Sequence, residues 1–200
     1  MSPTVYHPTA ARPQAEIRIH PERGAPEEAA AILAAGYVAH VGFVADGVPY
    51  VIPMTYQFDP ADAKRIYLHG AHHSRLMEQV ASGAPICVSM TMVDGLVFSR
   101  TALYHSVNYR SVVCFARAAP EPDAETRRRV LEAMIARYFP GRTAGRDYEE
   151  APAAHLEATA FVALEIEEWS AKVRRGGPKG PRDADPIAWG TAGVVPLSVL

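Results

Sequence analysis

The sequence predicts a mainly β protein with a few helices, whose antiparallel strands close into a barrel. Several short runs are rich in Val, Ile, Phe, Tyr and Thr, the residues that favour strands. Two Asp-Gly pairs separate such runs, and this pair favours tight hairpin turns between antiparallel strands. Roughly six strands with few helices are too many for one open sheet in a domain this small, so closure is favoured.

The expected elements between residues 26 and 58 are a helix and a hairpin. The helix at 26–35 has two glutamates in its first turn and a glycine after its last residue, as the helix dipole and C-terminal capping favour. The strands at 37–44 and 48–58 flank Asp46-Gly47, a pair typical of a type I′ turn.

The expected elements between residues 65 and 118 are strands interrupted by one short helix. A strand at 65–69 leads into a helix at 74–81, which Ser74 would cap. Asp94-Gly95 predicts a second hairpin turn. The remaining apolar, β-rich runs predict strands at 86–93, 96–103 and 111–118.

The last third begins with a long amphipathic helix expected at 123–139, which Pro140-Gly141 ends. A strand is expected at 159–166. Closely spaced glycines and prolines exclude regular structure from 176 to 185. The proline-rich residues 1–20 predict an extended N-terminal arm, which leaves 21–200 as a single domain.

Composition and charge exclude several classes of protein. A net charge of −2 without a long basic run argues against a nucleic-acid binder, and only Lys172–Arg182 is locally basic. No apolar run is long enough to span a bilayer, and no signal peptide is evident. Cys87 and Cys114 form no CxxC pair and lie in apolar runs, so no disulfide is expected. We therefore expect a cytoplasmic protein that does not associate with membranes.

The first candidate site is the strand-to-helix junction in the sequence IYLHGAHHSR, residues 66–75. Unpaired amides at the helix start, the Ser74 hydroxyl and the Arg75 guanidinium would converge there, and such groups attract a phosphate. An ordinary connection with solvated polar residues stays open as an alternative. A metal site is not expected, because His69, His72 and His73 would point in different directions and no carboxylate or cysteine lies nearby in sequence.

The second candidate site is the polar segment SRTALYHSVNYRS, residues 99–111, between two apolar strands. Polar groups drawn into a barrel wall need partners, which a bound polar ligand would supply. A long solvated loop is the alternative.

These segments occur in an order that resembles a known family. VPYVIPMTYQF, YLHGAHHSRL, DGLVFSRTALYHSVNYRSVV, SAKVRRGGP and WGTAGVVPL follow one another over residues 16–197. This order resembles the flavin-nucleotide-binding proteins related to pyridoxamine 5′-phosphate oxidase and to nitroimidazole-resistance proteins. The resemblance implies an antiparallel split β-barrel of the FMN-binding type. It also implies a homodimer with FMN, less often FAD, at the interface.

The resemblance also implies the cofactor-binding residues. The flavin ring would lie along the strand 52–56, with His69, Ser74 and Arg75 facing its phosphate. The segment 106–111 would close the site. The complete set comprises Ile52, Pro53, Met54, Thr55, Tyr56, His69, Ser74, Arg75, Ser106, Asn108, Tyr109, Arg110, Ser111 and Lys172.

The expected function is that of a flavin-dependent oxidoreductase acting on a small organic molecule, with NAD(P)H as a possible electron donor. No residue stands out as an acid, base or nucleophile, so no catalytic residue is assigned. Many relatives carry a lysine at the position of Leu76, and the C-terminal substrate-gripping signature of true pyridoxamine-phosphate oxidases is not evident. Two alternatives stay open: a haem-binding split-barrel protein with His69 or His105 as axial ligand, and a flavin-binding sensory protein without turnover.

Overall fold

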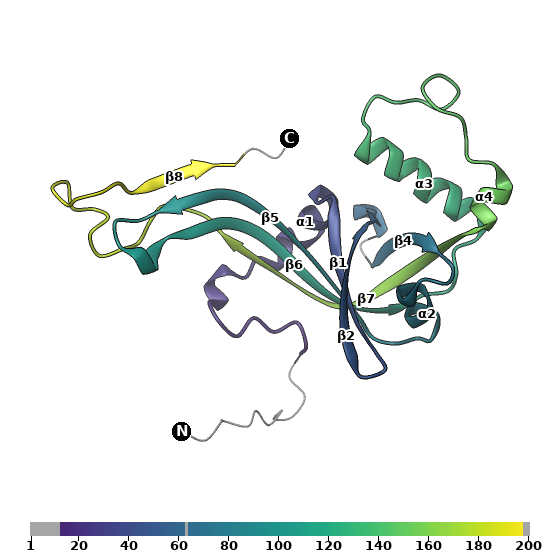
Figure 1. Cartoon of the computed structure of the whole chain (residues 1–200), viewed down its shortest axis with the longest axis horizontal. Helices are drawn as coiled ribbons and strands as arrows, with labels where there is room; N and C mark the ends of the chain where they lie inside the picture. The colour runs from purple at the N-terminus through teal and green to yellow at the C-terminus, as the bar shows by residue number, and fades with distance from the viewer. Residues whose placement is uncertain (1–12, 63, 198–200) are drawn as a thin grey trace.

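The computed structural model describes residues 13–62 and 64–197, and they contain one antiparallel sheet of eight strands that curls around a core (Figure 1). The strand order is β2-β1-β5-β6-β7-β4-β3, and β8 also pairs with β5. The predicted mainly β, split-barrel fold is confirmed. The strands are β1 (Val38–Ala45), β2 (Val48–Thr55), β3 (Gln57–Phe58), β4 (Arg65–Ala71), β5 (Ile86–Phe98), β6 (Ser106–Ala118), β7 (Thr159–Arg174) and β8 (Gly193–Pro196).

The described residues also contain four α-helices and four short 3₁₀ turns, of which η1, η2 and α1 precede β1. The α-helices are α1 (Ala29–Ala35), α2 (Arg75–Ala81), α3 (Ala124–Tyr138) and α4 (Ala153–Glu157). The 3₁₀ turns are η1 (Pro21–Arg23), η2 (Pro26–Glu28), η3 (Pro60–Asp62) and η4 (Ala102–Tyr104). Within the described ranges, no helix is both long and apolar enough to cross a membrane.

The barrel core forms where alternate residues of the strands point inward and α1 packs against them. In β1, residues 39, 41, 43 and 45 are buried, while their neighbours are exposed or half-buried. Ile32 and Leu33 of α1 are fully buried in the same core. Period-two alternation therefore places one face of each strand inside, as the sequence pattern indicated.

The predicted Asp46-Gly47 hairpin is confirmed, because both residues have positive φ, 52° and 75°, and Ala45 pairs with Val48. The second predicted turn, at Asp94-Gly95, is wrong. β5 continues through it as one strand with a β-bulge between Val93 and Gly95. A Cβ at Gly95 would lie 3.0 Å from the carbonyl oxygen of Val195, so the glycine admits β8 alongside the bulge.

The strands β5, β6 and β7 are longer than the sequence indicated, and their outer halves form an arm that extends away from the barrel (Figure 1). The chain reverses between β5 and β6 at η4, so residues 106–111 are the start of β6 and not a loop. β8 runs along this arm and pairs with residues 95–98 of β5. β8 and α4 were not expected from the sequence.

The described part of the predicted N-terminal arm, residues 13–20, lies against β7. The Ala15 amide donates to Glu168, and the Ile19 carbonyl accepts a hydrogen bond from Lys172. Residues 1–12 of the predicted arm lie outside the described residues.

Candidate functional site

Strand β2, which was predicted to lie along a flavin ring, is an edge strand. Within the described part of the chain it pairs only with β1, so the amides and carbonyls on its other edge are not used in the sheet. Ile52 and Met54 face inward and pack on the core, whereas Pro53 and Thr55 are exposed. The strand can therefore offer backbone hydrogen bonds to a planar ligand beside it.

Tyr56, the last residue of the predicted strand segment, lies between the end of β2 and the start of β3 and interrupts the strand there. Its side chain is fully buried, and its hydroxyl donates to the Leu33 carbonyl at 2.5 Å. Its amide donates to the Tyr138 hydroxyl, and its carbonyl accepts from Arg137. Burial raises the pKa of Tyr56 to about 12. The polar groups of Tyr56 are thus engaged within the chain, so Tyr56 fits the predicted ligand contact least well.

The junction between β4 and α2 has the predicted cap. The Ser74 hydroxyl accepts a hydrogen bond from the Met77 amide at 3.3 Å, so Ser74 is the N-cap of α2. The exposed Arg75 places its guanidinium 4.4 Å from the ring centroid of Tyr50, a residue of β2. Tyr50 in turn stacks on Phe43 of β1. Tyr50 was not predicted from the sequence as a site residue, although it lies on the same face of β2 as Ile52 and Met54.

Gly70 completes the contact between this junction and β2. A Cβ at Gly70 would lie 3.1 Å from Met77 and 3.9 Å from Met54, which places α2, β4 and β2 together at one point. We call the predicted residues gathered here the β2–α2 cluster, which comprises Ile52, Pro53, Met54, Thr55, Ser74 and Arg75.

His69 was predicted to face the phosphate with Ser74 and Arg75, but it lies on the opposite face of β4 from Leu68 and Gly70. Its ring stacks on its cross-strand neighbour Phe161, with centroids 5.6 Å apart. Its Nδ1 atom is buried and has no hydrogen-bond partner in the described part of the chain. Burial lowers the pKa of His69, so the imidazole is neutral at pH 7.

The other predicted residues lie on the outer arm. We call them the β6–β7 cluster: Ser106, Asn108, Tyr109, Arg110, Ser111 and Lys172. Strand alternation places Ser106, Asn108 and Arg110 on the side of the buried Val112, and Tyr109 and Ser111 on the other side.

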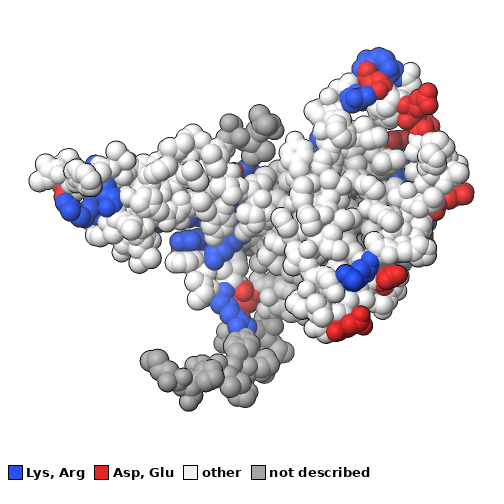
Figure 2. Space-filling model, viewed as in Figure 1, with Lys and Arg blue, Asp and Glu red and all other residues white. Residues whose placement is uncertain are grey.

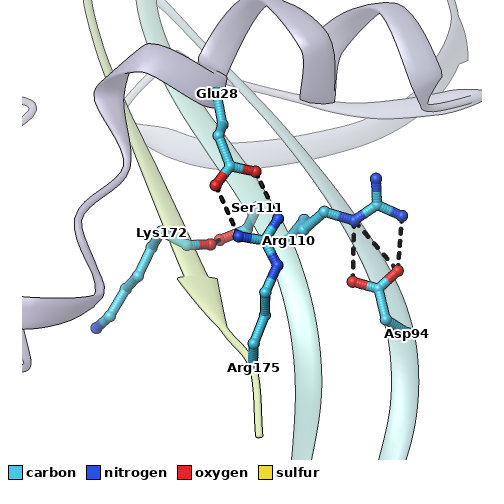
Figure 3. Close-up of polar contacts among 6 residues, drawn as sticks. All are labelled: Glu28, Asp94, Arg110, Ser111, Lys172 and Arg175. Atoms are coloured by element: carbon cyan, nitrogen blue, oxygen red, sulfur yellow. Dashed lines mark hydrogen bonds and ion pairs between the residues drawn. The ribbon is translucent and has the colours of Figure 1, made fainter. Parts of the chain in front are cut away.

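Arg110 is held in a bidentate ion pair with Asp94, with its Nη2 atom 2.6 Å from the carboxylate (Figure 3). This hydrogen bond and the Asp94 charge raise the pKa of Arg110. A second bidentate pair joins Arg175 to Glu28, at the start of α1. Asp94 was not predicted as a partner of Arg110, because the Asp94-Gly95 pair predicted a turn at this position.

The other polar groups of the β6–β7 cluster are tied to β7 and to the chain that follows it. The Ser111 hydroxyl donates to the Lys172 carbonyl at 3.2 Å (Figure 3). The Asn108 amide group donates to the Gly176 carbonyl and accepts from Arg174. Much of the hydrogen-bonding capacity that was expected to need a ligand is therefore satisfied within the chain.

The two clusters do not meet within one chain. β2 and α2 lie at the barrel, whereas the start of β6 lies at the far end of the arm (Figure 1). No hydrogen bond, ion pair or ring contact joins the clusters within the described ranges. A ligand that touches both clusters would need them to come from different copies of the chain.

The described residues contain no group of three or more His, Cys, Asp or Glu side chains that could hold a metal ion.

Residues 25–173, which include both clusters, match the family model described as pyridoxamine 5′-phosphate oxidase. The chain belongs to the pyridoxamine 5′-phosphate oxidase-like family. The family resemblance inferred from the sequence is therefore confirmed. No curated protein matches the chain.

Two solved structures that share the fold of this chain are at least 30% identical to it. The FAD- and haem-binding protein from Mycobacterium smegmatis is 32% identical, with a TM-score of 0.74, over 88% of this chain and 84% of that one. The flavocytochrome Anf3 from Azotobacter vinelandii is 30% identical, with a TM-score of 0.77, over 93% of this chain and 85% of that one.

A more distant structure also has the fold. A protein from Bacteroides thetaiotaomicron assigned to 5-nitroimidazole antibiotic resistance is 18% identical over 74% of this chain and 84% of that one. Its TM-score is 0.59, and at this identity the likeness extends to the fold alone.

Proposed function

We propose that this protein binds a flavin nucleotide between two copies of the chain and acts as an oxidoreductase on a small organic molecule. The observation that carries the proposal is the 32% identity to an FAD- and haem-binding protein over 88% of the chain. The family match over residues 25–173 supports the same cofactor class.

The β2–α2 cluster supports the proposal from the chain's own residues. The unused edge of β2 offers carbonyls to the polar rim of an isoalloxazine ring, together with the amides of Val51 and Thr55, because Pro49 and Pro53 have no N–H. Arg75 lies over the ring of Tyr50, a residue of this strand, and no carboxylate in the described chain is paired with its guanidinium. Its charge can therefore be offered to a phosphate. The bound flavin would supply the hydride and electron chemistry, while these residues would anchor and orient it.

The separation of the two clusters supports a homodimer. An exposed apolar strip crosses the arm on strands β8, β5 and β6, where Val195, Leu96 and Val107 lie directly across from one another. This outer apolar strip comprises Val93, Leu96, Phe98, Val107 and Val195, each 38–49% exposed. A second copy packed on the strip would cover it and bring its own β2–α2 cluster to Tyr109 and Ser111, the residues of the β6–β7 cluster on the same side of β6 as the strip.

Haem is a second candidate cofactor, beside the flavin. Two relatives with 30% identity or more are described as an FAD- and haem-binding protein and as a flavocytochrome. His69 suits an axial ligand, because burial favours its neutral imidazole and its Nδ1 atom has no partner among the described residues. His105 is less suitable, because it is exposed on the turn after η4, where its Nδ1 contacts the Ala102 carbonyl.

The visible absorption spectrum of the purified protein tests both candidates. The two bands of an oxidised flavin, with the released nucleotide identified by chromatography, are expected. An added Soret band that shifts in a His69→Ala variant would assign the haem to this residue. Protein that binds neither FMN nor FAD when titrated as apoprotein would contradict the proposal. Reduction by NADPH with turnover of organic acceptors would distinguish an enzyme from a sensory flavoprotein.

A further inference from the structure

A basic pocket of about 200 Å³ lies between the N-terminal segment and the end of β7. Its walls come from η1, from the last residues of β7 and from the loop that follows. The bridge between Gly24 and Lys172 holds the N-terminal segment against β7 at this point. The pocket is lined by Glu22, Arg23, Val173, Arg174, Arg175 and Lys179. Figure 2 shows Lys and Arg side chains gathered where the N-terminal segment crosses the arm.

The pocket carries more positive charge than its carboxylates balance. Arg175 is paired with Glu28, and Arg23 lies 3.8 Å from Glu22. Among the described residues, Arg174 donates only to neutral oxygens, those of Asn108 and Gly177. No hydrogen bond or ion pair to Lys179 occurs in the described part of the chain. Two cations in one small pocket therefore have no carboxylate partner.

The pocket is separate from the β2–α2 cluster. Arg174, Arg175 and Lys179 follow the last residue of the family match, and Arg23 precedes its first. The pocket adjoins the β6–β7 cluster, because the Arg174 guanidinium contacts Asn108 directly. An anion bound here would therefore lie next to a ligand held by the β6–β7 cluster.

We infer that this pocket binds the phosphate or diphosphate group of a nucleotide ligand. The planar guanidinium of Arg174 suits the bidentate geometry of phosphate oxygens, and Lys179 adds a mobile point charge. The volume is sufficient for a diphosphate. Two sources share this chemistry: the diphosphate of FAD itself and that of a dinucleotide electron donor. The inference that FAD is the source rests on the proposed flavin function, whereas the anion site itself does not.

Calorimetric titration of ADP into the apoprotein tests the pocket without relying on flavin binding. Lys179→Gln should weaken ADP binding by about tenfold to a hundredfold, and Arg174→Gln should do the same. The matched control is Arg182→Gln, which removes the same charge from the same loop. Arg182 lies outside the pocket, within 3.7 Å of Asp185, so its variant should bind ADP like the wild type. Circular dichroism checks that each variant is folded.

The source of the diphosphate is separated by comparing three ligands in wild type and Lys179→Gln. Weaker FAD binding with unchanged FMN binding assigns the pocket to the cofactor. Weaker NADPH binding with unchanged FAD binding assigns it to the electron donor. Equal ADP affinity in wild type and both pocket variants, or no ADP binding at all, would overturn the inference. If no flavin binds but ADP binding still depends on Lys179, the proposed function fails and the anion site stands.

Discussion

At the scale of single residues, the proposed flavin site depends on Arg75, the first residue of α2. Its guanidinium rests on Tyr50 and carries no carboxylate partner in the described chain. If it bonds a flavin phosphate, Arg75→Ala should lose about 1.5 to 3 kcal/mol of binding, roughly tenfold to a hundredfold in the dissociation constant. FMN titration into apoprotein measures this. Arg128→Ala, which removes a guanidinium paired with Glu125 and Glu132 on the surface of α3, is the control. Wild-type affinity in Arg75→Ala would remove Arg75 from the site.

His69 gives a pH-dependent prediction. Burial lowers its pKa from the ordinary value of 6.5, so the unfolded chain binds this proton before the folded one does. The stability linked to His69 is therefore complete above pH 6.5 and is lost as the pH falls through the folded-state pKa. His69→Phe keeps a ring against Phe161 and should flatten the decline in unfolding free energy of the apoprotein between about pH 7 and 5. Urea denaturation at several pH values measures this unfolding free energy. A decline that is the same in His69→Phe as in the wild type would contradict a lowered pKa of His69.

Local signals were sufficient for some site residues and insufficient for others. The Ser74 cap was predictable, because it depends on residues within one helical turn. The Arg110–Asp94 pair was not, because it depends on a bulge that keeps Asp94 in β5 beside β6. The side chain of His69 points to the face of β4 opposite Leu68 and Gly70, as strand alternation requires. The prediction grouped His69 with Ser74 and Arg75 because they are close in sequence.

At the scale of elements, the two Asp-Gly pairs show that this pair alone does not establish a turn, because one forms a hairpin turn and the other lies within β5. The pair at 46–47 has the positive φ angles of a type I′ turn at both residues. At 94–95, β8 pairs with residues 95–98 of β5 across an interval of about a hundred residues. This long-range pairing supports an extended backbone there, and a sequence window around the Asp-Gly pair does not include it.

Helix α3 was predictable because its cap and apolar stripe are local: Asp123 accepts from the Thr126 amide at 2.8 Å.

Helix α3 is fastened to the β2–β3 break by Tyr138. Its hydroxyl accepts a hydrogen bond from the Tyr56 amide and can donate to the Tyr37 carbonyl at 2.7 Å. Tyr138→Phe leaves the Tyr56 amide without an acceptor and should lower the unfolding free energy by about 1 to 3 kcal/mol. Tyr148→Phe removes a hydroxyl that makes no hydrogen bond in the described chain and should change it by less than about 0.5 kcal/mol. Equal urea midpoints for the two variants would contradict the role of Tyr138.

At the scale of the whole molecule, the proposed homodimer would cover the outer apolar strip of the arm. Light scattering of the flavin-loaded protein should give twice the chain mass of 21.7 kDa. Replacing Leu96 and Val107 with Glu places two like charges opposite each other on the strip and should shift the mass towards 21.7 kDa. Substituting Glu for the exposed Ile187, which lies outside the strip, is the control and should leave the mass unchanged. A wild-type mass of one chain would refute the dimer.

The central claim, a flavin held between the β2–α2 cluster of one subunit and the β6–β7 cluster of the other, is tested most directly by mixed dimers. Subunits carrying Arg75→Ala are coexpressed with subunits carrying Tyr109→Ala, because Tyr109 lies on the side of β6 that carries the outer apolar strip, and the heterodimer is isolated through two different tags. If the site spans the subunits, one site in each heterodimer contains intact Arg75 and intact Tyr109. Half of the sites should then bind flavin with wild-type affinity, although both parent homodimers bind weakly. If every site in the heterodimer stays weak, each site lies within one subunit and the account is contradicted.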